Sequence, residues 1–149
     1  MDRYRVREEP ATGLTVLISI LNAASALESR VDARLATAGL SLPKLAALRA
    51  LVAADDAIPL GQLACRLACV KSNVTQLVER LEADGLAVRA LDPTDRRSRL
   101  AAITDAGRHA YEEGVQILRA AEHDLFDALT PDELEELARL IRKLDPRCS

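Results

Sequence analysis

Aromatic side chains are nearly absent from this chain of 149 residues, of which they make up only 2%. Tyr4, Tyr111 and Phe126 are the full set, and there is no tryptophan. Hydrophobic residues still reach 49%, so the chain can bury a core, but only one built from aliphatic side chains and alanine. Such a composition favours helices over strands and predicts a mainly helical fold.

Signals for export and membrane insertion are also missing. The N-terminal residues MDRYRVREEP lack the apolar stretch of a secretion signal, and we expect no apolar run with the length of a membrane span. The three cysteines, an odd number, predict mostly reduced thiols and no disulfide framework. We therefore expect a cytoplasmic protein with no membrane association.

Motifs of catalysis and cofactor binding are absent as well. The chain has no Gly-x-Ser-x-Gly elbow, no phosphate-cradling loop and no HExxH pair. His109 and His123 fall roughly 21 Å apart along one helix, at about 1.5 Å per residue, so they cannot share a metal within one chain. We expect no enzyme, no cofactor and no metal site.

The most informative stretch runs from Lys71 to Ile103. It begins with an apolar stripe at helical spacing, formed by Val74, Leu77, Val78 and Leu81, which must pack inward. Hydrogen-bonding side chains lie on the opposite face and its flanks: Ser72, Asn73, Thr75, Gln76, Glu79 and Arg80. A face of this kind can contact base edges in the major groove of DNA.

A tight β-ribbon is expected to follow this helix. Asp84-Gly85 ends the helix, residues 86–91 and 96–103 are the expected strands, and Asp92-Pro93-Thr94-Asp95 supplies the turn between them. Three arginines lie at or just after the tip: Arg96, Arg97 and Arg99. A loop this short and charged suits a phosphate backbone or a minor groove.

Residues 63–107, LACRLACVKSNVTQLVERLEADGLAVRALDPTDRRSRLAAITDAG, resemble the multiple antibiotic resistance regulator (MarR) family of winged helix-turn-helix repressors. The resemblance rests on the DP-x-DRR wing and the TxxG helix start. It implies a mainly α fold with a small β-wing (α+β), a winged helix-turn-helix over about 42–103, and dimerisation helices over about 12–38 and 104–145. Residues 12–149 would form this single domain, and residues 1–11 a flexible tail.

The order of helices along the chain fits this architecture. Gly39 ends the first helix, and the helix Leu42–Ala54 begins at a Ser41 cap. A polar break before Pro59 leaves room for a short extra strand. The positioning helix, residues 60–68, is expected to place Leu63, Leu67 and the small Ala64 inward. Thr104 starts a long helix to about Leu129, and Thr130-Pro131-Asp132-Glu133 is a capping box for the last one.

The first helix and the last two carry more apolar stripe than one small winged-helix core can cover. A second copy of the chain would cover it, because symmetric dimers are the commonest solution. Two recognition helices related by a two-fold axis would read half-sites about 10 base pairs apart, which predicts a palindromic operator in double-stranded DNA.

The residues of the expected DNA interface suit different kinds of contact. Thr75 and Gln76 are expected to face DNA, and Ser72 and Asn73 either contact bases or cap the helix. Lys71 and Arg80 suit phosphates. At the tip, the resemblance implies that Asp95 holds Arg97 in place. Arg96, next to Arg99 in the wing, would then be the side chain that enters a DNA groove.

The net charge of −3 looks unsuitable for a DNA-binding protein until it is divided along the chain. Residues 60–103 carry seven Lys or Arg and five Asp or Glu, whereas residues 104–149 carry six and eleven. What matters for binding DNA is the local field, and the excess acid belongs to the C-terminal helices. Their acidic surface leaves open another interpretation, a winged-helix dimer used for protein contacts.

Two further expectations concern regulation. The resemblance implies release from DNA when a small lipophilic or phenolic effector binds between the dimerisation helices and the winged domain. Cys65 and Cys69, four residues apart beside the turn, leave a thiol-based redox switch as an alternative, against buried inert thiols as the default. Cys148, next to the C-terminus, is expected to be exposed.

Overall fold

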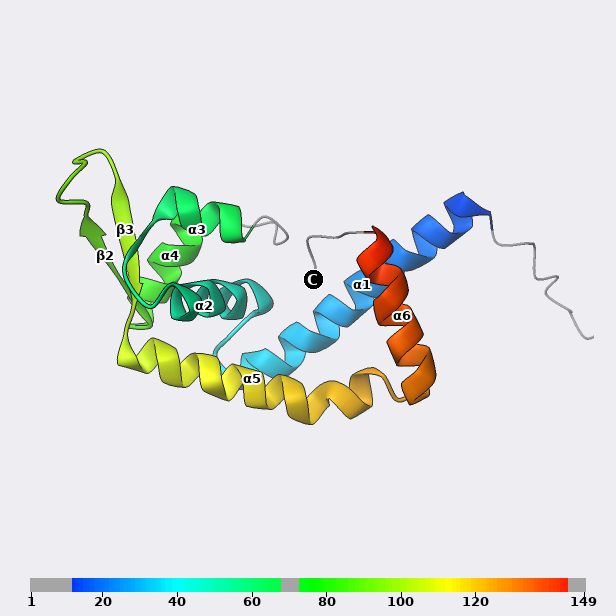
Figure 1. The fold of residues 1–149 in the computed structure, drawn as a ribbon. Helices are drawn as coiled ribbons and strands as arrows, with labels where there is room; N and C mark the ends of the chain where they lie inside the picture. The colour runs from blue at the N-terminus through cyan, green and yellow to red at the C-terminus, as the bar shows by residue number, and fades with distance from the viewer. Residues whose placement is uncertain (1–11, 68–72, 145–149) are drawn as a thin grey trace, which may run out of the picture.

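The computed structural model describes residues 12–67 and 73–144. Its elements, in chain order, are α1 (Gly13–Leu35), the 3-10 turn η1 (Ala36–Ala38), α2 (Leu42–Ala54), β1 (Ile58–Pro59), α3 (Leu60–Arg66), α4 (Val74–Ala83), β2 (Ala87–Leu91), β3 (Arg99–Ile103), α5 (Asp105–Leu125) and α6 (Pro131–Leu144). Figure 1 shows α2, α3, α4 and the strands gathered at one end, with α5 leading away from them to α6 at the other. The predicted fold, mainly α with a small β-wing, is confirmed.

The strands form one antiparallel sheet in the order β1-β3-β2. Ile58 of β1 pairs with Ala101 of β3, so the predicted extra strand before the positioning helix is present. β2 and β3 pair from Ala87 with Ile103 to Leu91 with Arg99. We call β2, β3 and the turn between them the wing.

An aliphatic core holds the helices of the winged helix-turn-helix together. Its fully buried large side chains come from α1, α2, α3 and α4: Leu35, Leu48, Leu51, Leu63, Val78 and Leu81. Of the predicted α4 stripe, Leu77, Val78 and Leu81 are buried and Val74 is half-buried. The core therefore orients α4 so that its polar face points outward.

The predicted helix ends are confirmed at most boundaries. Gly39 and Gly85 have φ of 68° and 73°, the left-handed conformation that glycine adopts without strain. After α4, Gly85 N–H donates to Glu82 O (3.0 Å) and Leu86 N–H to Leu81 O (2.8 Å), which is the Schellman pattern. Ser41 caps α2, accepting from Lys44 N–H.

Several expectations were wrong in detail. α5 ends at Leu125 and not near Leu129, β2 begins at Ala87 and β3 at Arg99. Ala64 is exposed, because on the short α3 only Leu63, with Leu67 one turn later, faces the core.

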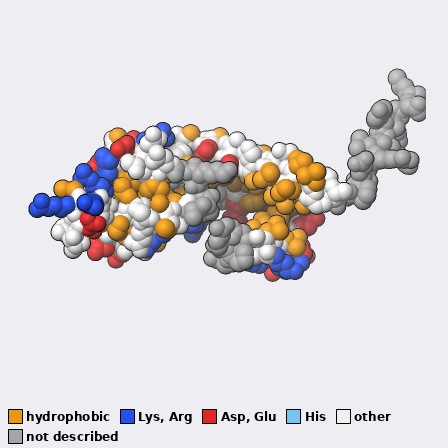
Figure 2. Space-filling model, turned by 90° about the horizontal axis from the view of Figure 1, so that it is seen from above, with side chains coloured by type: hydrophobic (Ala, Val, Ile, Leu, Met, Phe, Trp, Pro, Cys, Tyr) orange, Lys and Arg blue, Asp and Glu red, His pale blue; other side chains and the backbone are white. Residues whose placement is uncertain are grey.

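Two helices leave apolar side chains uncovered. No residue of α6 is buried, and its stripe of Leu134, Leu137, Leu140, Ile141 and Leu144 is half-buried to exposed. In α1, Leu14 is 67% and Leu21 60% exposed. Figure 2 shows hydrophobic side chains around a hollow toward the end of the molecule where Figure 1 places α1 and α6.

The segment Gly13–Ala38 has the length and composition of a membrane span, because one window of 18 residues within it reaches a mean hydropathy of 1.3. The expectation that no segment reaches this measure was therefore wrong. The larger apolar residues of the segment are concentrated in the uncharged stretch 14–27, and its charged residues begin at Glu28. Its exposed apolar side chains require a cover, whether from protein or from lipid.

Candidate nucleic-acid interface

The outward face of α4 carries the predicted polar side chains. Thr75, Gln76, Glu79 and Arg80 are all exposed on it. Asn73 is the N-cap: its Oδ1 accepts from Gln76 N–H at 3.3 Å, which confirms the capping alternative for this residue. Lys71 and Ser72, also predicted to bind DNA, lie outside the described residues.

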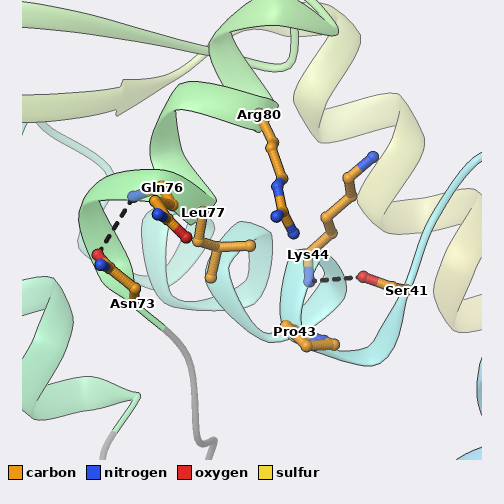
Figure 3. A pocket seen from close by; sticks show the side chains of 7 residues that line it. All are labelled: Ser41, Pro43, Lys44, Asn73, Gln76, Leu77 and Arg80. Carbon is orange, nitrogen blue, oxygen red and sulfur yellow. Dashed lines mark hydrogen bonds between the residues drawn. The ribbon is translucent and has the colours of Figure 1, made fainter.

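A hollow of about 310 Å³ separates the start of α2 from this face (Figure 3). It is lined by Ser41, Pro43, Lys44, Asn73, Gln76, Leu77 and Arg80. In Figure 3 the Arg80 side chain extends toward the side chain of Lys44. Lys44 Nζ donates to Asp84 Oδ2 (2.6 Å) and Gly39 O (3.2 Å). The ammonium group of Lys44 therefore links α2 to the end of α4.

The wing tip is closed by its own aspartates. Asp92 Oδ1 accepts from Thr94 N–H (2.8 Å) and Thr94 Oγ1 (2.6 Å), and these bonds lower the pKa of Asp92 below 3.8. Asp95 Oδ1 accepts from Arg97 N–H at 2.9 Å. Asp95 thus braces the main chain at Arg97, and the brace expected between the two side chains is not formed.

This arrangement leaves the wing cations available. The carboxylates of Asp92 and Asp95 accept neutral N–H and O–H groups, while Arg96, Arg97 and Arg99 are exposed. Within residues 12–67 and 73–144, none of these three arginines forms an ion pair. In Figure 2, the blue side chains of Lys and Arg gather at the end of the molecule where Figure 1 places the wing.

Sequence reasoning missed Arg89, which joins β2 to α4. Its Nη1 lies 3.1 Å from Glu79 Oε1, and its Nη2 2.7 Å from Glu82 Oε2. The hydrogen bond from its side chain lowers the pKa of Glu82 and raises the pKa of Arg89. The only signal in the sequence was a basic residue a few positions beyond two acids, across a predicted turn. Lys44 was missed because it belongs to another helix.

Cys65 is exposed on α3, so the default of buried thiols was wrong for this residue. Cys69 and Cys148 lie outside the described residues, and the alternative of a Cys65–Cys69 switch stays a prediction. Among the residues searched, no three His, Cys, Asp or Glu side chains are grouped as a metal site would need.

Comparison with known proteins supports a family assignment. The model of the MarR family matches residues 38–98. The uncharacterized HTH-type transcriptional regulator YkoM of Bacillus subtilis (strain 168) is 38% identical over 86 residues, which are 56% of this chain and 54% of the relative. Over the matched segments, the chain spans about half or less of the first curated relatives.

Solved structures cover more of the chain. A probable transcriptional regulator from Pseudomonas aeruginosa is 30% identical with a TM-score of 0.68, covering 81% of this chain and 92% of that one. A mutant MarR from E. coli, complexed with operator DNA, is 21% identical with a TM-score of 0.75, covering 91% and 100%. At that identity, the second likeness shows the fold alone.

Proposed function

This chain belongs to the MarR family of transcription regulators, and from that membership we propose that it binds a palindromic DNA operator as a homodimer and represses transcription there. One observation carries the proposal: the exposed polar face of α4 and the exposed wing arginines lie at the same end of the molecule. The structure of E. coli MarR complexed with operator DNA, which has the same fold, supports this docking.

The contacts divide by chemistry. Thr75 and Gln76 are placed to reach base edges, with Asn73 at the start of the helix. Arg80, Arg96, Arg97 and Arg99 supply charge for phosphates or a minor groove, which positions the protein without reading sequence. Lys71 and Ser72 belong to the proposed set of DNA-binding residues as well.

Dimerisation and release complete the proposal. The exposed apolar side chains of α1 and α6 would pack against those of a second copy, so residues 12–38 and 104–145 act as dimerisation helices around the winged helix-turn-helix at about 42–103. A small lipophilic or phenolic effector would bind between these helices and the winged helix-turn-helix. Its binding would change the distance between the two copies of α4, the recognition helices of the dimer, and so release DNA.

The proposed activity is binding and not catalysis, and its place is the cytoplasm, where the operator would lie. The family consists of transcription regulators, and no enzymatic step is part of the mechanism. The competing function is a dimer that uses its acidic C-terminal helices for protein contacts alone.

Fluorescence anisotropy with the intergenic DNA beside the gene, against a scrambled duplex at two salt concentrations, tests the proposal. We expect tighter binding to the intergenic DNA and a steep loss of affinity as salt rises, because phosphate contacts release counterions. Equal, weak binding to both duplexes would contradict specific recognition and favour the protein-contact function.

A further inference from the structure

The outward face of α4 is not uniformly suited to DNA. Glu79 lies one turn after Thr75 and Gln76, at i+4 and i+3, so it shares their face. Glu82 follows one turn later, and both carboxylates keep substantial exposure, 50% and 37% of their side chains. Two carboxylates at this place would repel the phosphates that the wing arginines attract.

Arg89 occupies both carboxylates at once. Its Nε donates to Glu82 Oε2 (2.7 Å), its Nη2 lies 2.7 Å from the same oxygen, and its Nη1 donates to Glu79 Oε1 (3.1 Å). Its main-chain N–H also donates to Glu82 Oε1 at 3.3 Å. All three guanidinium nitrogens are therefore engaged, so Arg89 holds the two acids instead of offering its charge to DNA.

The register of the wing places this cluster beside a DNA-binding side chain. Arg89 pairs with Ala101 and Leu91 with Arg99, so Arg89 and Arg99 lie on the same face of the ribbon. Glu82, Arg89, Ala90, Leu91 and Arg99 line one hollow of about 410 Å³ between α4 and the wing. Arg99 is the cation that lines this hollow together with Arg89, so it would face Glu82 if Arg89 were removed.

We propose that Arg89 is a positioning residue for DNA recognition: it holds Glu79 and Glu82 in ion pairs, which keeps these acids from opposing the phosphates and leaves Arg99 available to DNA. The inference rests on the proposed function. Exposed ion pairs add little to the stability of a folded protein. The effect of Arg89 therefore belongs to DNA affinity, with little effect on the melting temperature.

The test compares four variants in the anisotropy assay, with melting temperatures recorded for each. Arg89→Ala should weaken binding about tenfold on operator and scrambled duplex alike, because two uncompensated charges face the phosphates. Adding Glu79→Gln and Glu82→Gln to Arg89→Ala should restore most of the affinity. Arg139→Ala is the matched control, since it breaks an exposed Arg–Glu pair with Glu136 that lies outside the apolar stripe of α6.

The fourth variant, Glu79→Gln/Glu82→Gln with Arg89 intact, keeps the inference testable should Arg89→Ala fail to fold. It should bind DNA at least as tightly as the wild type, because neither carboxylate remains to repel the phosphates. Unchanged affinity in Arg89→Ala, failure of the glutamines to restore it, or weaker binding by the double glutamine variant would overturn the inference alone. A wild type that binds no duplex would overturn the proposed function, and the inference with it.

Discussion

Gln76 and Arg96 represent two different kinds of DNA contact at the scale of single residues. Arg96→Ala should weaken binding to every sequence and reduce the salt slope by about 1, because one phosphate or groove contact is lost. Gln76→Ala should relax preference at one base position, by about 1–3 kcal/mol of discrimination. Anisotropy titrations over a set of singly substituted operators, at several salt concentrations, measure both effects.

These two variants also control for each other. A general loss of folded protein would lower both affinities in the same way, whereas different tasks give different patterns. Full operator affinity in both variants would contradict the proposed docking of α4 and the wing.

Gly107 shows why the helix start after the wing has the form TxxG. Thr104 Oγ1 accepts from Gly107 N–H (3.0 Å) and donates to Gly85 O (2.7 Å), which ties the start of α5 to the end of α4. A Cβ at position 107 would overlap the main-chain oxygen of Leu86. No side-chain adjustment relieves such a contact, so the backbone itself would have to move.

Gly107→Ala should therefore lower the free energy of unfolding by about 2 kcal/mol, within the range of overpacked sites. Gly61→Ala is the matched control, because a Cβ there meets nothing within 4 Å. On α3 that change should be neutral or stabilise the protein by up to about 1 kcal/mol. Urea unfolding at one fixed protein concentration compares the two, and equal stabilities would refute the steric explanation.

At the scale of elements, local chemistry predicted the fold well. Caps and a left-handed glycine marked the start of α2, both ends of α4 and the start of α5, because these signals act within a few residues. The end of α5 had no such signal. Helix-forming residues continue past Leu125, and the chain leaves the helix at Phe126, whose φ is −121°.

The residues of the candidate site that the sequence did not predict, Arg89 and Lys44, also lacked a local signal. The outward face of α4 followed from its apolar stripe, because burial of one face decides the other. Arg89 and Lys44 reach Glu82 and Asp84 only after the wing and α2 have packed beside α4. The inward placement of Ala64 failed likewise, since small size alone does not determine which face of a short helix is covered.

The capping box of α6 gives a prediction that depends on pH. Thr130 N–H donates to Glu133 Oε2 (2.8 Å), and Thr130 Oγ1 lies 3.0 Å from the same oxygen; both bonds lower the pKa of Glu133 below 4.5. A lowered folded-state pKa means that the cap contributes fully above the unfolded value and is lost as pH falls through the folded one. We therefore expect the first turn of α6 to fray as the pH falls below the ordinary titration range of a glutamate.

NMR titration of the Glu133 carboxyl measures this effect directly. Its midpoint should lie below the ordinary glutamate value, and Thr130→Ala should return it toward 4.5 because the side-chain donor is gone. A midpoint that Thr130→Ala leaves unmoved would show that the hydroxyl does not contribute.

At the scale of the whole molecule, the exposed wing arginines and the uncovered apolar side chains lie at opposite ends. The wing arginines form one end, and the exposed side chains of α1 and α6 form the other (Figure 2). Neither end is complete alone: an apolar face needs a cover, and a single recognition helix reads only half of a palindrome. A symmetric dimer satisfies both needs, and it also accounts for the membrane-like composition of Gly13–Ala38.

Leu140→Asp tests this connection between assembly and DNA binding. Leu140 is 44% exposed on the apolar side of α6, so a carboxylate there should be tolerated by the monomer but excluded from an apolar dimer interface. We expect sedimentation velocity to show monomers, and operator affinity to fall about a hundredfold, because the two half-sites no longer bind as one unit. Arg142→Asp, which places the same carboxylate on the polar side of α6, should remain dimeric. Monomers that keep full operator affinity would contradict recognition by a dimer, whereas a Leu140→Asp dimer would place the interface elsewhere.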